Sequence, residues 1–126
     1  MTNEEPRIPS EQALAFAKQR ARERSLNLDV VRNSLMEKFS PLCNLDNIYV
    51  IPEGDFQFRV AVFFSSDKDV IACMDSGLCQ SIQDHAFDEV ERVGRGIRDE
   101  VTIAFEFDSD ENVQKNYKGD YWFRLH

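Results

Sequence analysis

The sequence is poor in the residues that build metal centres and disulfide frameworks. Its 126 residues include two histidines, His85 and His126, and three cysteines, Cys43, Cys73 and Cys79. A zinc site needs convergent His and Cys ligands at short spacings, which this chain does not offer. An odd and sparse set of cysteines is typical of free thiols in a reducing compartment. We therefore expect no metal, no other cofactor and no disulfide.

Long apolar runs are missing as well. The longest are short, as in residues 60–64, whereas a membrane-spanning helix needs roughly 18 apolar residues. Residues 1–10 are polar and acidic and lack the basic, apolar and small-residue segments of a secretory signal. These absences predict a cytoplasmic protein with no membrane partner.

Basic charge is scarce outside the N-terminal third. The net charge is −8; residues 1–40 carry seven basic and six acidic side chains, whereas residues 41–126 carry eight basic and seventeen acidic ones. Phosphates need a basic footprint, so this distribution argues against a nucleic-acid ligand. It favours a basic protein partner, unless it serves solubility alone.

The chain has the length of one domain, with residues 1–9 expected to form a flexible tail and residues 10–126 the domain itself. Ser10 can cap a first helix that runs to about Arg24, and a second helix is expected over residues 29–39, ended by Pro41. Apolar residues spaced by three or four predict one long helix over residues 67–93, although Gly77 lies inside it. A strand over residues 69–74 followed by a shorter helix is the alternative.

Alternation of apolar and polar residues predicts strands at 47–51, 56–65, 101–108 and 120–126, with a short helical turn after Ser109. Such one-sided alternation is typical of a mainly antiparallel sheet with one covered face and one face in water. The expected order is α-α-β-β-α-β-(α)-β. The fold class is therefore α+β, a two-layer sandwich with helices on one face of the sheet.

Two stretches resemble ligand-binding motifs and then depart from them. Asp108 begins an acidic run like that of an EF-hand, but Val113 stands where that loop needs glycine. Gly94 and Gly96 follow an expected helix, whereas a phosphate-binding loop precedes one. They suit a turn better than a nucleotide site.

The thiols offer no clear catalytic arrangement. Cys73 and Cys79 are six residues apart, about 240° around a helix, so they would not share a face. Cys79 and His85 could be combined into a nucleophile–base pair, but no spacing singles them out. Packing in the core or exposure at the surface is the simpler role for the cysteines.

Two surfaces are candidates for contact with a partner. Asp84, Asp88 and Glu91 lie opposite the apolar stripe of the helix expected over residues 67–93 and would form an acidic ridge, unless they are only a solvated face. Trp and Arg are enriched at the energetic centres of interfaces, although a tryptophan can also pack at a sheet edge. The second surface is the solvent-facing row of the sheet, expected to display Arg59, Thr102, Glu106, Trp122, Arg124 and His126.

In its size, acidity and single-domain build the chain resembles the small immunity proteins of bacterial polymorphic toxin systems, including contact-dependent growth inhibition. The stretch that carries the resemblance is Phe105-Glu106-Phe107-Asp108-Ser109, Glu111-Asn112-Val113, Asn116-Tyr117, Gly119 and residues 121–125. The resemblance implies a cytosolic, non-catalytic inhibitor that covers the active site of a toxin.

A nuclease toxin has a basic cleft, because it must bind phosphates, and carboxylates placed where phosphates would sit give fast and specific association. The residues expected to bind the partner are Glu106, Asp108, Asp110 and Glu111, together with Tyr121, Trp122 and Arg124, and secondarily Asp84, Asp88 and Glu91.

Two other functions fit the same sequence. An adaptor or scaffold subunit would use the exposed sheet face as its contact, and a small metal-dependent hydrolase would use the carboxylates of residues 108–111. Stable self-association would favour the adaptor, and the sequence alone leaves the oligomeric state open.

Overall fold

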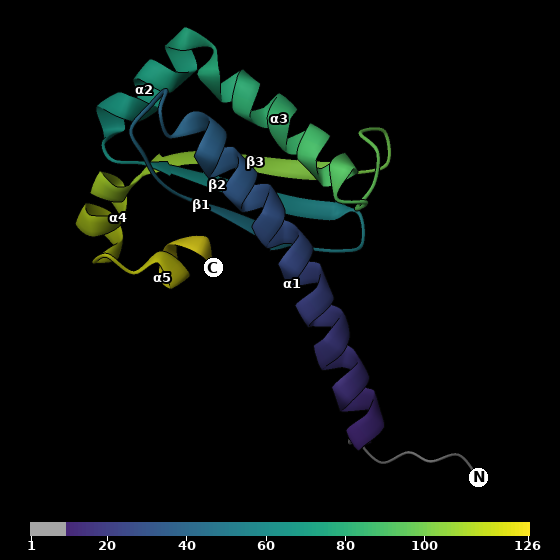
Figure 1. Ribbon diagram of the computed structural model, residues 1–126. Helices are drawn as coiled ribbons and strands as arrows, with labels where there is room; N and C mark the ends of the chain where they lie inside the picture. The colour runs from purple at the N-terminus through teal and green to yellow at the C-terminus, as the bar shows by residue number, and fades with distance from the viewer. Residues whose placement is uncertain (1–9) are drawn as a thin grey trace.

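A single long helix opens the part of the chain that the structure describes. The computed structural model describes residues 10–126 (Figure 1). For residues 17 and 20–26 it describes the backbone alone. The flexible tail expected over residues 1–9 lies outside the described residues. Helix α1 spans Glu11–Phe39, and Ser10 caps it by accepting a hydrogen bond from the Ala13 amide at 3.1 Å.

The expected division of this segment into two helices was wrong. Residues 25–28 contain neither proline nor glycine, so nothing removes a backbone hydrogen bond between the two expected helices. The C-terminal half of α1 packs on the body of the protein through four residues spaced by three or four: Leu28, Val31, Leu35 and Phe39. The N-terminal half projects away from the body (Figure 1).

The sheet has three strands, β1 (Leu45–Pro52), β2 (Gln57–Phe64) and β3 (Thr102–Ser109), in the order β1-β2-β3. β1 and β2 form an antiparallel hairpin, in which Val50 faces Val60, whereas β3 lies parallel to β2, with Phe105 beside Val60. The sheet is therefore mixed rather than mainly antiparallel. The reason is the long connection between β2 and β3, which holds two helices and is long enough to cross back over the sheet.

These crossover helices are α2 (Asp67–Ser76) and α3 (Leu78–Arg92). Ser66 caps α2 in a capping box with Asp69, as a helix start requires. Gly77 adopts a left-handed conformation with φ +80° and ends α2, so the one long helix expected over residues 67–93 is two helices, and no strand forms over residues 69–74.

The strand expected over residues 120–126 does not form either. Ser109 caps α4 (Asp110–Tyr117), as expected, but the next element is the short helix α5 (Tyr121–Leu125), capped by the Asp120 carboxylate on the Phe123 amide at 2.9 Å. Tyr121 and Leu125 are four residues apart and so share one helical face, which is the face that packs on the sheet.

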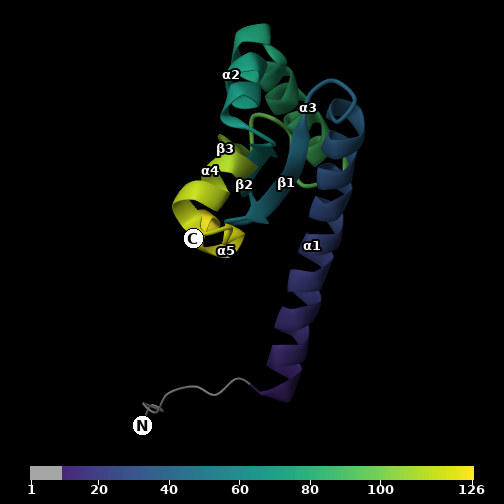
Figure 2. The ribbon, with the colours of Figure 1, turned by 90° about the vertical axis from the view of Figure 1, so that its left-hand side faces the viewer.

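Helices therefore cover both faces of the sheet, so the expected two-layer sandwich with helices on one face was wrong. The α+β class is confirmed. Figure 2 shows α1 on one side of the strands and α4 and α5 on the other. The larger core, on the side of α1 and α3, takes the even-numbered residues of β2, such as Phe58 and Val62. The smaller core, under α4 and α5, contains Ala61, Phe63, Val113 and Leu125.

Candidate functional site

Helix α5 is anchored to the sheet by ion pairs. Arg124 Nε donates to Asp108 Oδ2 at 2.7 Å, and its Nη1 donates to Glu106 Oε1 at 3.1 Å. Arg59 of β2 donates to the other oxygen of Glu106 and to the Leu125 carbonyl oxygen. The Arg59 guanidinium, supported by Arg124 and opposed by burial, holds the pKa of Glu106 below its usual range. Two strands and the C-terminal helix thus share one charged network.

Tyr121 makes the second attachment of α5. Its ring packs against Phe63 edge-on, with centroids 4.9 Å apart, and against Tyr49 at 5.8 Å. Its hydroxyl lies 3.1 Å from Asp46 Oδ2 and also hydrogen-bonds Asp110. Burial and the Asp110 carboxylate raise the pKa of Tyr121, so the phenol keeps its proton and acts as a donor.

Trp122 and Phe123 point outward from this anchored helix, and we call them the aromatic pair. Trp122 is 70% exposed and Phe123 is 60% exposed. Trp122 stacks on His126 with ring centroids 4.7 Å apart, and Phe123 meets Tyr117 edge-on at 5.7 Å. The structure therefore displays two large apolar side chains in water on a helix whose opposite face is attached to the sheet.

The carboxylates expected to bind a partner have internal roles in the structure. Glu106 and Asp108 are half-buried and paired with arginines, and Asp110 accepts from Tyr121 and Gln114. Glu111 is exposed and accepts from the Asp67 amide at 2.9 Å, which joins α4 to α2. Of this group only Glu111 is exposed, and the others position α4 and α5.

The acidic ridge of Asp84, Asp88 and Glu91 lies on α3, which packs on the opposite face of the sheet from α5. All three residues are exposed, and Asp84 pairs with Arg98 at 3.3 Å. Asp88 and Glu91 form no ion pair with another described residue. The ridge and the aromatic pair are therefore two separate surfaces and cannot belong to one contact of small area.

A polar cluster that the sequence did not predict joins α1 to α3. Ser34 donates to the Glu89 carboxylate and lies 3.1 Å from His85 Nε2, and Lys38 Nζ lies 3.5 Å from His85 Nδ1. Burial and the neighbouring Lys38 lower the pKa of His85, whereas hydrogen bonding to Arg92 lowers that of Glu89. Residues 85 and 89 are one helical turn apart, and this spacing was the signal in the sequence from which their contact could have been predicted.

This cluster does not have the arrangement of a catalytic triad. In a triad the carboxylate orients the histidine nitrogen that does not contact the serine, whereas Glu89 accepts from Ser34 and lies 3.8 Å from His85 Nε2, the nitrogen that Ser34 also contacts. Cys79 lies in the core and is not among the hydrogen-bonding partners of His85. The pairing of Cys79 with His85 is therefore not supported, and the cluster serves to fix α1 on α3.

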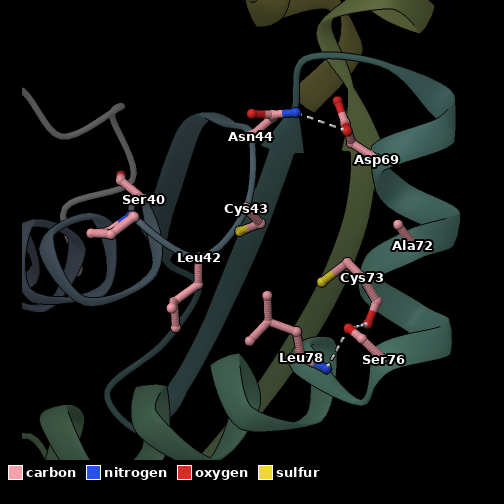
Figure 3. Close-up of a pocket in the computed structure, with 10 residues that line it drawn as sticks. Ser40, Leu42, Cys43, Asn44, Asp69, Ala72, Cys73, Ser76 and Leu78 are labelled. Atoms are coloured by element: carbon pink, nitrogen blue, oxygen red, sulfur yellow. Dashed lines mark hydrogen bonds between the residues drawn. The ribbon is translucent and has the colours of Figure 1, made fainter.

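A pocket of about 460 Å³ opens between the loop after α1 and helix α2 (Figure 3). Cys43 lies on the loop side and Cys73 on the α2 side. Contrary to the helical-wheel argument, Cys73 and Cys79 meet, with sulfurs 2.9 Å apart, because Gly77 breaks the helix between them. Burial raises the pKa of Cys43 to about 11 and of Cys73 to about 12, which leaves the thiols protonated and poorly nucleophilic.

The described residues contain no group of three or more His, Cys, Asp or Glu side chains arranged to hold a metal ion. Within residues 10–126, no helix combines the length and apolarity needed to cross a membrane. Comparisons with models of protein families, with curated proteins and with solved structures found no match for this chain.

Proposed function

We propose that this protein is a non-catalytic inhibitor of the immunity-protein type, which binds a basic partner such as a nuclease toxin and covers its active site. The observation that carries the proposal is the aromatic pair, Trp122 and Phe123, displayed in water on a helix that side-chain contacts hold in place. Large aromatic residues of this kind dominate the energetic centres of protein interfaces.

The anchoring of α5 supports a binding role, because a surface that is already ordered loses little conformational entropy when a partner binds. Arg124 and Tyr121 attach the helix at both ends, at Asp108 and at Asp110. We assign these four residues to positioning the aromatic pair rather than to contacting the partner. This changes the expectation for Asp108, whose oxygens are occupied by Arg124 and by the amide groups of Ser109 and Asn112.

The charge of the molecule supports a basic partner. Residues 41–126 carry seventeen acidic and eight basic side chains, so the body has a negative field that would attract a basic active site and repel nucleic acid. Two exposed carboxylates lie next to α5: Asp46 accepts from the Tyr121 hydroxyl, and Asp120 caps the helix. They supply acidic charge beside the helix that displays the aromatic pair, and polar groups beside an apolar centre are usual at an interface.

Two observations weigh against the two other functions. The sheet face that an adaptor would expose is covered by α4 and α5 over Ala61 and Phe63. The carboxylates that a hydrolase would use are bound to Arg124, Tyr121 and the Asp67 amide.

The test is a pull-down at low salt from the native cytosol and from the products of neighbouring genes, using the wild type and two double variants. Trp122→Ala/Phe123→Ala removes the aromatic pair, and Ile71→Ala/Met74→Ala removes an equally exposed apolar pair on α2. We expect the affinity of the first variant for a tight basic partner to fall at least about a hundredfold, and the second variant to keep the affinity of the wild type.

The isolated partner must then lose its enzymatic activity in the presence of the wild type. A partner that binds both double variants equally would remove the aromatic pair from the interface. A partner whose activity is unchanged when bound would overturn the inhibitor function.

A further inference from the structure

The N-terminal half of α1 projects beyond the body of the protein. Leu28 is the first buried residue among the described side chains of the helix, and residues 11–27 extend away from the sheet, as Figures 1 and 2 show. At 1.5 Å per residue this segment, which we call the arm, is about 25 Å long. A lone helix of this length is marginally stable in water, so the arm gains stability from any surface on which it packs.

The arm carries two large apolar side chains in water, and one of them, Leu14, lies on the face that continues the core stripe. Leu14 is 44% exposed and Phe16 is 64% exposed. Leu14 precedes the buried Leu28 by fourteen residues, that is, by two heptads, and seven residues take a helix through nearly two full turns. Leu14 therefore lies on the side of α1 that packs on the body farther along.

The charge of the arm is opposite to that of the rest of the chain. Residues 11–27 contain four basic and two acidic residues, whereas the net charge of the whole chain is −8. Two arms packed on one another would bring like charges together. An acidic surface is the complementary partner, and the chain itself supplies one in the ridge of Asp84, Asp88 and Glu91.

The arm cannot reach the ridge of its own chain. Residues 11–39 form one uninterrupted helix without glycine or proline, so there is no hinge at which the arm could fold back. A second copy has no such restriction. Helix α3 has fifteen residues and is therefore about 22 Å long, which matches the length of the arm.

We propose that two copies form a symmetric dimer, in which the arm of each lies along the acidic ridge of α3 of the other. Such an interface is self-complementary, because the same two surfaces meet twice around a two-fold axis. Leu14 contacts the second copy beside α3, and Lys18, the basic residue of the arm whose side chain the structure describes, faces Asp88 and Glu91, which have no ion-pair partner among the described residues. The inference goes beyond the proposed function and uses surfaces distinct from the aromatic pair.

The test is the molar mass of the full chain in solution, measured by light scattering and by analytical ultracentrifugation over a range of protein and salt concentrations. We expect a dimer at low salt that dissociates as salt is added. Leu14→Asp and Asp88→Lys/Glu91→Lys should each raise the dissociation constant about tenfold or more. Ile71→Asp, which changes another exposed apolar residue, on α2, should leave the dissociation constant unchanged.

A charge exchange sharpens the test. Lys18 is an exposed basic residue of the arm, so Lys18→Glu should weaken the dimer, and Lys18→Glu combined with Asp88→Lys should recover affinity relative to either change alone. Unchanged unfolding midpoints would show that the variants remain folded. A monomer at every soluble concentration, or a dimer insensitive to both the arm and the ridge variants, would overturn the proposal. Loss of the aromatic pair must not affect the dimer.

Discussion

Arg124 of α5 lies 2.7 Å from Asp108 at the end of β3, and both side chains are mostly shielded from water. Through this contact the C-terminal helix is tied to the strand that precedes α4. The same guanidinium reaches Glu106, which Arg59 of β2 also binds. The position of the aromatic pair thus depends on residues from three parts of the chain.

We expect Arg124→Ala to destabilise the protein by about 2 kcal/mol, because it removes one ion-pair partner from each of two partly buried carboxylates, Glu106 and Asp108. Chemical denaturation measures this loss. The matched control is Asp84→Ala, which removes an ion pair with Arg98 between half-exposed side chains and should cost no more than about 0.5 kcal/mol. Equal losses in the two variants would show that the network around Arg124 has no special role in stability.

The cluster of Ser34, His85 and Glu89 predicts that stability falls in acid in two stages. Burial and Lys38 depress the pKa of His85 from its ordinary 6.5, so the unfolded chain binds more protons and stability declines as the pH falls below about 6.5. Hydrogen bonding to Arg92 depresses the pKa of Glu89 from 4.5, so the contribution of Glu89 to stability is complete above that pH and is lost below it.

Unfolding free energies measured from pH 8 to pH 3, roughly the range in which such groups titrate, test this order. His85→Gln should remove the upper stage and keep the lower one. A variant whose profile matches that of the wild type between pH 7 and pH 5, roughly the window of an ordinary histidine, would show that His85 does not control this stage.

Periodicity was a sound guide where one face of an element is buried over its whole length. In β2, Phe58, Val60, Val62 and Phe64 alternate and all face the larger core, as predicted. The stripe of α3 was equally clear. Periodicity was a poor guide at residues 121–125, because Tyr121 and Leu125 fit a strand and a helix equally well in so short a segment.

The candidate site was predicted in part. The exposure of Trp122 was predicted, although on a strand rather than on a helix. The pairing of Glu106 with Arg59 and Arg124 was not predicted, since the partners are 47 and 18 residues away and local spacing carries no information about them. Phe63, which broke the alternation of β2, was the sequence signal that its second face is also covered.

Two glycines should respond differently to alanine. Gly77 has φ +80° and open space where the methyl group of an alanine would lie, so Gly77→Ala should cost only the backbone strain, about 1 kcal/mol. At Gly96, with φ +133°, the added Cβ would lie 2.7 Å from Val101 Cγ1, so Gly96→Ala should cost clearly more. Gly54→Ala is the control in the same denaturation series, and equal effects at Gly77 and Gly96 would contradict the steric argument.

The three thiols should be slow to react in the folded protein. A thiol whose pKa is about 11, as at Cys43, holds about a hundredfold less thiolate at neutral pH than one at its ordinary 9.0, and Cys73 holds less still. Iodoacetamide labelling followed by mass spectrometry should therefore modify Cys43 slowly and Cys73 and Cys79 more slowly, whereas all three react at once in denaturant. Labelling of native Cys73 at the rate of a free thiol would show that the pocket between α1 and α2 opens far enough to hydrate the thiolate, and that these cysteines do not belong to a static core.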